Sequence, residues 1–327
     1  MTGARPLLDA ASVRSLLRAA GLRARHDRSQ NFLVDVEVLE SILEAAEPRT
    51  GGRVLEIGPG LGILTGALLE AGACVTAVEL DAGLASFLRA RLVDAVTRGA
   101  VAGFGEPGAL RLIEGDALDQ DLPDLVPPPF DVVANLPYHI TSPILHRLLE
   151  RSPRPARMVL MVQREVAERV AAPPGQMSYL SVFVQYHAKV RIARIVRPDS
   201  FEPAPKVDSA ILVLEPYPED DRLPDAAAED ALWRVVQAAF RERRKMIHNV
   251  LARQLPLSGA QVAAALDAAG ILPDRRPQTL GVGEWLALRE ALGPVGPDLR
   301  GRRRESLAPD ETGDEGSDAP HEPADGV

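Results

Sequence analysis

The chain has 327 residues, of which 46% are hydrophobic and 25% are charged, and its formal net charge is −9. This composition is typical of a globular protein with one large domain and a smaller one. No apolar run approaches the roughly 20 residues of a membrane helix, and the only cysteine, Cys74, excludes intramolecular disulfides and cysteine-rich metal clusters, so we expect a cytoplasmic protein without a bound metal.

The negative charge is concentrated at the C-terminal end of the chain. Residues 301–327 hold eight acidic side chains against three arginines. Because residues from 296 onward are also poor in hydrophobic side chains, we predict that 296–327 form a disordered acidic tail. The net charge alone therefore does not exclude a polyanionic partner, since basic residues elsewhere can gather on one face.

Between residues 53 and 163, short apolar runs alternate with amphipathic stretches. The apolar runs predict strands and the stretches between them predict helices, with strands at 53–57, 74–80, 110–115, 130–135 and 157–162 and helices at 61–72, 82–96, 142–150 and 163–170. Continuous apolar strands separated by helices are typical of a parallel sheet covered on both faces. We therefore predict a doubly wound, Rossmann-like α/β fold, and we expect the glycine-rich stretch 97–109 to be a surface loop.

The pattern changes after a Pro/Gly break at 173–175. Residues 179–196 and 209–216 predict a helix or strand followed by strands that complete the sheet. From residue 226 the periodicity becomes helical, with segments at 227–240, 243–254, 259–269 and 282–292. The predicted organisation is an α/β domain over residues 1–218, a small all-helical domain over 219–295 and the tail at 296–327.

A glycine-rich turn, Glu56-Ile57-Gly58-Pro59-Gly60-Leu61-Gly62, follows the first predicted strand and opens a helix. Glycines in this position let a ligand approach the backbone closely. A dinucleotide fold would favour a GxGxxG turn that places a pyrophosphate at the helix N-terminus, whereas Pro59 interrupts that pattern and Glu56 suits a cationic ligand. The turn therefore favours S-adenosylmethionine, which carries a sulfonium and an ammonium group; the alternative is a tight turn that binds no ligand.

Polar residues also follow the next predicted strands. Glu79 ends the second strand and can accept hydrogen bonds from both hydroxyls of a ribose, although NAD-binding proteins use the same device. Asp116 follows the third strand and can accept a hydrogen bond from an adenine amino group, although such an aspartate more often belongs to a turn. Together with Gly58 and Asn135, these residues mark the carboxyl ends of successive strands, the edge at which open α/β sheets bind ligands.

A second loop, Asn135-Leu136-Pro137-Tyr138, lies between an apolar strand and a helix that begins near Ser142. Methyl transfer to an adenine amino group is difficult because the nitrogen lone pair is delocalised into the ring. The Asn135 side chain and a backbone carbonyl near Leu136 or Pro137 can accept the two amino hydrogens and aim the lone pair at a methyl donor. Tyr138 offers a ring on which an extruded base can stack. The alternative is an Asn-capped turn without a catalytic role.

A basic cluster lies near a predicted helix junction, where Arg241, Arg243, Arg244 and Lys245 fall within five residues. Such a cluster can neutralise several phosphates of a nucleic acid. Taken alone, a basic run is more often a solvated face of a helix.

Seven motifs in chain order resemble those of the KsgA/RsmA family of small-subunit ribosomal RNA adenine dimethyltransferases. They are Gln30-Asn31-Phe32-Leu33, EIGPGLGILT (56–65), VELD (78–81), EGDAL (114–118), NLPYHIT (135–141), FEPAPKVDSAI (201–211) and FRERRKMIHN (240–249). The resemblance implies a class I methyltransferase with S-adenosyl-L-methionine as cofactor and a C-terminal helical domain. It further implies dimethylation of two adjacent adenines in the 3′-terminal hairpin of 16S rRNA, late in small-subunit biogenesis, by a monomer that acts on a pre-assembled 30S particle.

The same resemblance implies roles for individual residues. The implied catalytic set is Asn135, Leu136, Pro137, Tyr138 and Phe201, in which Tyr138 and Phe201 sandwich the target base, although Phe201 can equally be a core residue. The implied cofactor-binding set is Gln30, Asn31, Leu33, Glu56, Gly58, Gly60, Glu79, Leu80, Asp116, Ala117 and Asn135, and the implied RNA-binding set is Arg241, Arg243, Arg244 and Lys245. Ser29 departs from the glycine usual in the family, which leaves open the path of the N-terminal arm over the cofactor.

Several alternatives remain open. A resistance-type large-subunit rRNA methyltransferase shares the glycine turn and an Asn-x-Pro-aromatic loop, whereas PKVDSA and RRKM favour the small-subunit group. A DNA adenine methyltransferase is disfavoured because no long target-recognition region is visible, and NAD binding would identify a dehydrogenase. The protein can also act mainly as an assembly factor that binds immature subunits.

Overall fold

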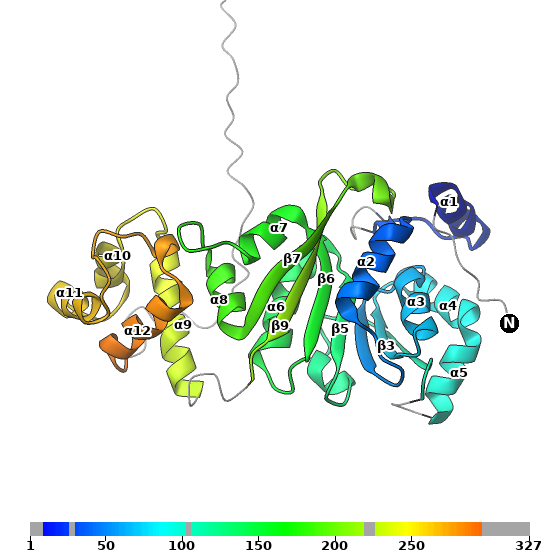
Figure 1. The fold of residues 1–327 in the computed structure, drawn as a ribbon, viewed down its shortest axis with the longest axis horizontal. Coiled ribbons are helices and arrows are strands. Elements are labelled where there is room, and N and C mark those ends of the chain that lie inside the picture. The colour runs from blue at the N-terminus through cyan, green and yellow to red at the C-terminus, as the bar shows by residue number, and fades with distance from the viewer. Residues whose placement is uncertain (1–8, 26–29, 103–105, 219–225, 296–327) are drawn as a thin grey trace, which may run out of the picture.

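A seven-stranded sheet lies at the centre of the computed structural model, which describes residues 9–25, 30–102, 106–218 and 226–295 (Figure 1). The strand order is β4-β3-β2-β5-β6-β9-β7. The strands are β2 (Arg53–Ile57), β3 (Cys74–Glu79), β4 (Leu110–Glu114), β5 (Asp131–Asn135), β6 (Arg157–Gln163), β7 (Ala188–Val196) and β9 (Ser209–Pro216). Strands β2 to β6 run parallel, and β9 is antiparallel to both β6 and β7. The predicted Rossmann-like α/β fold is confirmed.

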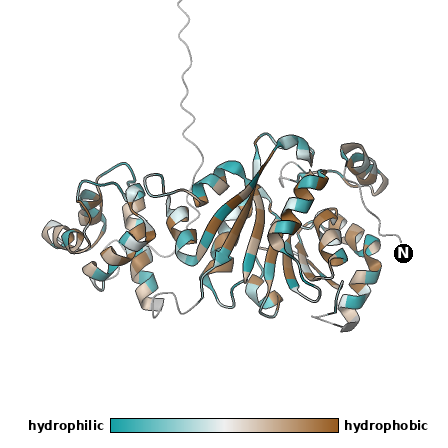
Figure 2. Ribbon diagram, viewed as in Figure 1, coloured by the Kyte–Doolittle hydropathy of each residue, from teal (hydrophilic) through white to brown (hydrophobic). Residues whose placement is uncertain are grey.

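Helices cover both faces of the sheet. On one face lie α2 (Val36–Ala46), α3 (Ile63–Glu70) and α5 (Val93–Ala102), and on the other lie α6 (Thr141–Glu150), α7 (Arg164–Val170) and α8 (Tyr179–His187). Alternate strand residues enter opposite cores, because successive side chains of a strand point to opposite faces. In β9, for example, Leu212 packs into one core and Val213 into the other. The hydrophobic strands stand out in Figure 2.

The prediction of a loop over residues 97–109 is wrong for its first half. The helix expected over 82–96 is two helices, α4 (Ala82–Arg91) and α5 (Val93–Ala102), and the second continues through Gly99. A Cβ at Gly99 would lie 2.3 Å from the carbonyl oxygen of Leu110, so this glycine allows α5 to pack closely against β4. Gly99 therefore serves helix packing, not a turn.

The N-terminal arm adds elements that carry little periodic signal in the sequence. Helix α1 (Ala10–Ala19) precedes the two-residue strand β1 (Phe32–Leu33), which pairs antiparallel with β8 (Phe201–Glu202). In this register Phe32 is opposite Glu202 and Leu33 is opposite Phe201. Two of the sequence motifs are thereby joined across the fold. Ser29 and the tail lie outside the described residues, so the expectations about them are not tested.

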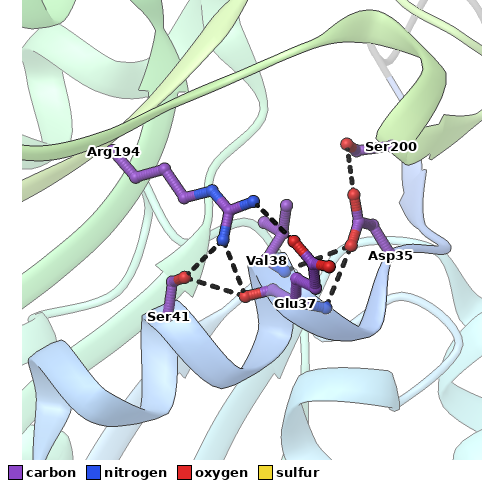
Figure 3. A network of polar contacts seen from close by, with 6 residues as sticks. All are labelled: Asp35, Glu37, Val38, Ser41, Arg194 and Ser200. Carbon is purple, nitrogen blue, oxygen red and sulfur yellow. Dashed lines mark hydrogen bonds and ion pairs between the residues drawn. The ribbon is translucent and has the colours of Figure 1, made fainter.

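A polar network holds the start of α2 against β7 and the turn before β8 (Figure 3). The guanidinium of Arg194 donates to the Glu37 carbonyl at 3.1 Å, to Ser41 Oγ at 2.8 Å and to Glu37 Oε2 at 3.2 Å. Asp35 caps the helix by accepting from the backbone amides of Glu37 and Val38, and it also accepts from Ser200 Oγ at 2.8 Å. These contacts fix the position of the first turn of α2, and with it the end of β1 that precedes the helix, relative to β7 and Ser200.

The C-terminal helices pack around a core of their own. They are α9 (Ala226–Phe240), α10 (Ile247–Gln254), α11 (Gly259–Ala268) and α12 (Val282–Leu292). The fully buried Trp285 lies in this core, to which Val182 and Tyr186 of α8 also belong. None of the described helices is long and apolar enough to cross a membrane.

Candidate active site

The glycine-rich turn lies directly under the N-terminal arm. Gly58, Gly60 and Gly62 have φ values of +69°, +57° and +77°, a backbone region that residues with a side chain rarely adopt. A Cβ at Gly60 would lie 3.1 Å from the Phe32 ring. The turn and the arm therefore form one compact wall, and Phe32, to which the sequence pattern assigned no role, belongs to it.

One cavity brings together residues from every strand end that the sequence singled out. Its walls come from the arm, the glycine turn and the carboxyl ends of β3, β4 and β5. All members of the expected cofactor-binding set line it, namely Gln30, Asn31, Leu33, Glu56, Gly58, Gly60, Glu79, Leu80, Asp116, Ala117 and Asn135. Leu136, Pro137 and Tyr138 of the expected catalytic set line it as well. Their individual roles remain predictions.

Backbone amides orient the carboxylates of Glu79 and Asp116, the two side chains predicted to bind the ribose and the adenine of the methyl donor. Glu79 is 5% exposed, and its Oε2 and Oε1 accept from the amides of Gly60 at 3.0 Å and Asp81 at 2.9 Å. Asp116 Oδ1 accepts from the amide of Leu118 at 2.8 Å. Each carboxylate oxygen can accept more than one hydrogen bond, so both side chains are fixed while keeping capacity for a ligand.

Glu56 has a different environment from Glu79. It is 1% exposed, and its Oε2 has no hydrogen-bond partner among the described residues. Burial raises the pKa of Glu56 to about 8, the Thr65 hydroxyl opposes the rise, and the negative charge of Glu79 adds to it. The cavity therefore contains a buried carboxyl group, that of Glu56, which stays largely protonated at neutral pH, beside the amide-held side chains of Glu79 and Asp116.

Asn135 is held by the arm. Its Nδ2 donates to the carbonyl oxygen of Asn31 at 3.1 Å. Its Oδ1 is left without a partner among the described residues, and a side-chain amide oxygen is an acceptor with two lone pairs. The geometry thus leaves the acceptor that methyl transfer to an amino group would require.

Tyr138 follows in a short 3-10 turn, Tyr138–Ile140, and its hydroxyl makes a hydrogen bond of 2.7 Å with Ser209 Oγ. Burial raises the pKa of Tyr138, and the bond to Ser209 opposes the rise. Ser209 is fully buried at the start of β9. The sequence pattern did not single out Ser209 as a site residue, although it belongs to the FEPAPKVDSAI motif.

Phe201, the predicted second ring of the aromatic sandwich, is buried. Its side chain is 2% exposed, packs into the core beneath α2, and does not belong to the walls of the cavity. Pairing with Leu33 in the two-stranded sheet explains this position, because it turns the ring toward the core. In this conformation Phe201 fits the alternative interpretation as a core residue, and its contact with a target base stays a prediction.

The basic cluster forms an exposed turn between α9 and α10. The helix expected from residue 243 begins at Ile247, because the preceding Met246 has extended backbone angles of −64° and 140°. Arg243, Arg244 and Lys245 are exposed and form no ion pair within the part of the chain that the structure describes. Arg241 instead donates to Gln254 Oε1 at 3.0 Å. Three of the four predicted RNA-binding side chains are therefore free to meet phosphates.

Comparisons with known proteins agree with this geometry. The sequence model of a family described as ribosomal RNA adenine dimethylase matches residues 21–292. Ribosomal RNA small subunit methyltransferase A of Anaeromyxobacter sp. (strain K) is 42% identical over 295 residues, covering 86% of this chain and 98% of that protein. The protein of the same name from Geobacter metallireducens is 41% identical over 289 residues, covering 86% and 99%.

Two solved structures are also similar. The 23S rRNA methyltransferase ErmE superposes with a TM-score of 0.62 at 32% identity and covers 80% of this chain and 99% of its own. A dimethyladenosine transferase from Plasmodium falciparum superposes with a TM-score of 0.63 at 28% identity, covering 79% and 95%. With a family match over most of its length and relatives above 40% identity, this chain belongs to the ribosomal RNA adenine dimethylase family.

Proposed function

We propose that this protein transfers methyl groups from S-adenosyl-L-methionine to the exocyclic amino groups of two adjacent adenines in the 3′-terminal hairpin of small-subunit rRNA. The observation that carries the proposal is the Asn135 side chain, whose amide nitrogen is engaged by Asn31 and whose oxygen remains available at the wall of the cavity. The names of the relatives, ribosomal RNA small subunit methyltransferase A, support the choice of RNA.

The chemistry of the cavity fits this methyl donor. Three acidic side chains line it, Glu56, Glu79 and Asp116, and no lysine or arginine does so among the described residues. A phosphate-bearing dinucleotide would meet net negative charge here, whereas a ligand with a sulfonium and an ammonium group would be attracted. Glu79 would hold the ribose, Asp116 the adenine amino group and the glycine turn the amino-acid end of the donor.

The residues of this chain would prepare the target amine. When bound, S-adenosylmethionine supplies an electrophilic methyl group. Asn135 Oδ1 and a carbonyl near Pro137 would accept the two amino hydrogens and direct the nitrogen lone pair at that methyl. Tyr138 would stack on the base. Once alkylated, the amine becomes acidic, so solvent can take its proton and no buried general base is needed.

The helical part of the chain would hold the RNA. We propose residues 1–218 as the methyltransferase domain and 219–295 as an RNA-binding domain that presents the basic turn at Arg243, Arg244 and Lys245. Phosphate contacts position a substrate without reading its sequence, so the choice of adenines would come from the shape of the rRNA in a pre-assembled 30S particle. We propose that the enzyme acts as a monomer.

The decisive experiment compares small and large ribosomal subunits that lack the modification. Purified protein is incubated with labelled S-adenosylmethionine and each subunit, and the RNA is digested for nucleoside analysis. Dimethyladenosine in small-subunit RNA alone is the expected result. Label in large-subunit RNA alone would favour methylation of 23S rRNA, the activity for which ErmE is named. Binding to subunits without methyl transfer would favour a role in subunit assembly.

A further inference from the structure

The basic turn between α9 and α10 carries positive charge that no carboxylate neutralises among the described residues. The two arginines and the lysine at positions 243–245 are exposed and form no ion pair there. Glu242, the acidic residue next to them in the sequence, is engaged elsewhere, since its Oε2 accepts from Arg253 at 2.8 Å and its Oε1 from Gln254 at 3.2 Å. The turn therefore keeps three free cations on a chain whose net charge is −9.

The last residues of the same chain carry the complementary charge. They belong to the acidic tail, 296–327, which lies outside the described residues. Beyond Arg304 the sequence has no lysine or arginine, and its acidic side chains are Glu305, Asp310, Glu311, Asp314, Glu315, Asp318, Glu322 and Asp325. A run of like charges with few apolar side chains cannot form a core of its own and is often an interaction segment for an oppositely charged surface.

The tail begins close to the basic turn. Helix α12 lies against α9 (Figure 1), and the carbonyl oxygen of Val295 accepts a hydrogen bond of 2.8 Å from Nη1 of Arg234 on α9. Arg234 precedes the last residue of α9, Phe240, by six positions, a rise of about 9 Å along the helix. Glu305 follows Val295 by ten positions, and ten residues can span up to about 35 Å. Every carboxylate of the tail is therefore within reach of the basic turn.

We propose that the acidic tail docks on the basic turn of its own chain and competes there with the phosphates of RNA. Because the tail is tethered to the same domain, its effective concentration at the turn is on the order of millimolar, so weak ion pairs suffice for docking. RNA that uses the turn must displace the tail, and RNA with no further contact to the protein is then held too weakly to stay bound. The inference rests on the proposed function in taking RNA as the competitor.

Carbodiimide cross-linking of the full chain tests the contact in the absence of RNA. The reagent joins a carboxylate to the amine of a lysine that touches it, and the chain has only three lysines, Lys189, Lys206 and Lys245, all of them exposed. We expect peptide mass spectrometry of the monomer to find tail carboxylates joined to Lys245. Small subunits added before the reagent should suppress this product.

Lys189 and Lys206 are the matched controls within the same molecule, since both are exposed strand or loop residues outside the helical domain. Tail carboxylates joined to all three lysines alike, or to none, would overturn the inference. Products that form only between two chains would overturn docking within one chain.

RNA binding gives a second test, with the eight tail acids of the full chain changed to asparagine or glutamine. At about 0.1 M salt we expect this variant to bind small subunits several-fold more tightly than wild type, and the gain should shrink as salt screens the ion pairs. In a chain that also carries Arg243→Ala, Arg244→Ala and Lys245→Ala, neutralising the tail should give no gain.

The outcomes separate docking from its alternatives. An equal gain with and without the basic turn would show that the tail repels RNA from a distance and does not dock. No gain in either background would show that the tail does not compete. A failure of wild type and of the tail variant to bind small subunits at any salt concentration would instead overturn the proposed function, whatever the cross-linking shows.

Discussion

The side-chain amide of Asn135 donates a hydrogen bond to the backbone carbonyl of Asn31 across 3.1 Å, joining positions 104 residues apart in the chain. The bond determines which end of the Asn135 amide is available, because the nitrogen is occupied and the oxygen is not. It also connects the N-terminal arm to the side chain that is proposed to hold the target amine. A displacement of the arm would rotate the acceptor away from the amine it is proposed to hold.

Replacing Asn135 tests this arrangement directly. Asn135→Ala removes the acceptor, and we expect kcat to fall by roughly two to three orders of magnitude, as for other preorganised hydrogen bonds to a reacting group. Asn135→Asp keeps the shape but sets a carboxylate against the Asn31 carbonyl, and its activity should be as low. Single-turnover methyl transfer to small subunits measures both variants.

The exposed Asn249 on α10 supplies the matched control for these asparagine variants. Asn249→Ala should leave the rate of a single turnover unchanged. Near wild-type turnover by Asn135→Ala, with donor binding intact, would remove Asn135 from the chemical step.

The hydrogen bond between Tyr138 and Ser209 predicts coupled effects on substrate use. Ser209→Ala and Tyr138→Phe each delete one end of the 2.7 Å bond while keeping the aromatic ring. Each should lower kcat/KM for small subunits by a few fold, because the ring is less well oriented for stacking, and the double variant should be no worse than either. A double-mutant cycle should give a coupling of about 1 kcal/mol. Additive losses would show that the two hydroxyl groups act independently.

The network at the start of α2 predicts that Arg194 supports the donor site from a distance (Figure 3). Arg194→Met removes three hydrogen bonds but keeps the aliphatic stem. We expect a loss of about 1 kcal/mol in the free energy of unfolding and a several-fold weaker affinity for S-adenosylmethionine, since β1 and Asn31 lead into this helix. Urea unfolding and calorimetry measure the two quantities.

Glu37→Gln separates the hydrogen bonds of Arg194 from its ion pair. The Glu37 side chain is 80% exposed, and exposed ion pairs contribute about 0–1 kcal/mol. This variant should therefore resemble wild type in both measurements. Equal losses in Arg194→Met and Glu37→Gln would mean that the charge, and not the contacts to the helix backbone and Ser41, positions α2.

The strand-end part of the site was predictable from the sequence for a physical reason. Parallel strands separated by helices bring their carboxyl ends to one edge, so Glu79, Asp116 and Asn135 could be expected in one cavity from their positions in the chain. The helix-length segments were also recognisable, because buried strands and amphipathic helices differ in the period of their apolar residues.

Long-range pairing was not predictable from such patterns. The strands β1 and β8 have two residues each, too few for a period, and their pairing depends on contacts between segments far apart in sequence. For that reason the burial of Phe201 opposite Leu33 and the bond from Ser209 to Tyr138 emerged only in three dimensions. The loop predicted around Gly99 was wrong for a simpler reason. The sequence does not distinguish a glycine that allows a helix to pack closely against a strand from a glycine in a loop.

The exposed basic turn predicts a salt-dependent contribution to RNA binding. Changing Arg243, Arg244 and Lys245 together to alanine should weaken binding to small subunits and reduce the slope of log K against log salt by about one for each phosphate that the variant can no longer neutralise. Donor affinity should not change. Filter binding over a salt series measures the slope, with Arg89→Ala as control, because Arg89 lies on α4 and pairs with Glu114. An unchanged slope would place the RNA on another surface.

His187 predicts how stability responds to acid. The ring is 1% exposed between Phe183 and Trp233, and neither nitrogen has a hydrogen-bond partner among the described residues. Burial lowers the pKa of His187 to about 3, with the charges of Arg154 and His146 adding to the effect. In the unfolded chain His187 is protonated below about pH 6.5, whereas in the folded protein it stays neutral down to about pH 3. The contribution of His187 to the free energy of unfolding is therefore fully present above pH 6.5 and is lost as the pH falls toward 3.

His187→Leu isolates that contribution, because leucine fills a similar volume and cannot titrate. The free energy of unfolding of wild type relative to His187→Leu should fall by a few kcal/mol between pH 7 and pH 4, as measured by urea unfolding at each pH. Other groups titrate in both proteins and cancel in the difference. A difference that stays constant with pH would mean that His187 has a partner, such as a buried water, that keeps its pKa near the ordinary value.

Since His187 ends α8, whose residues pack into both the sheet core and the helical core, the acid-induced loss should be accompanied by loosening of α9 against α8. Hydrogen exchange at pH 5 should therefore be faster in α9 of wild type than of the variant.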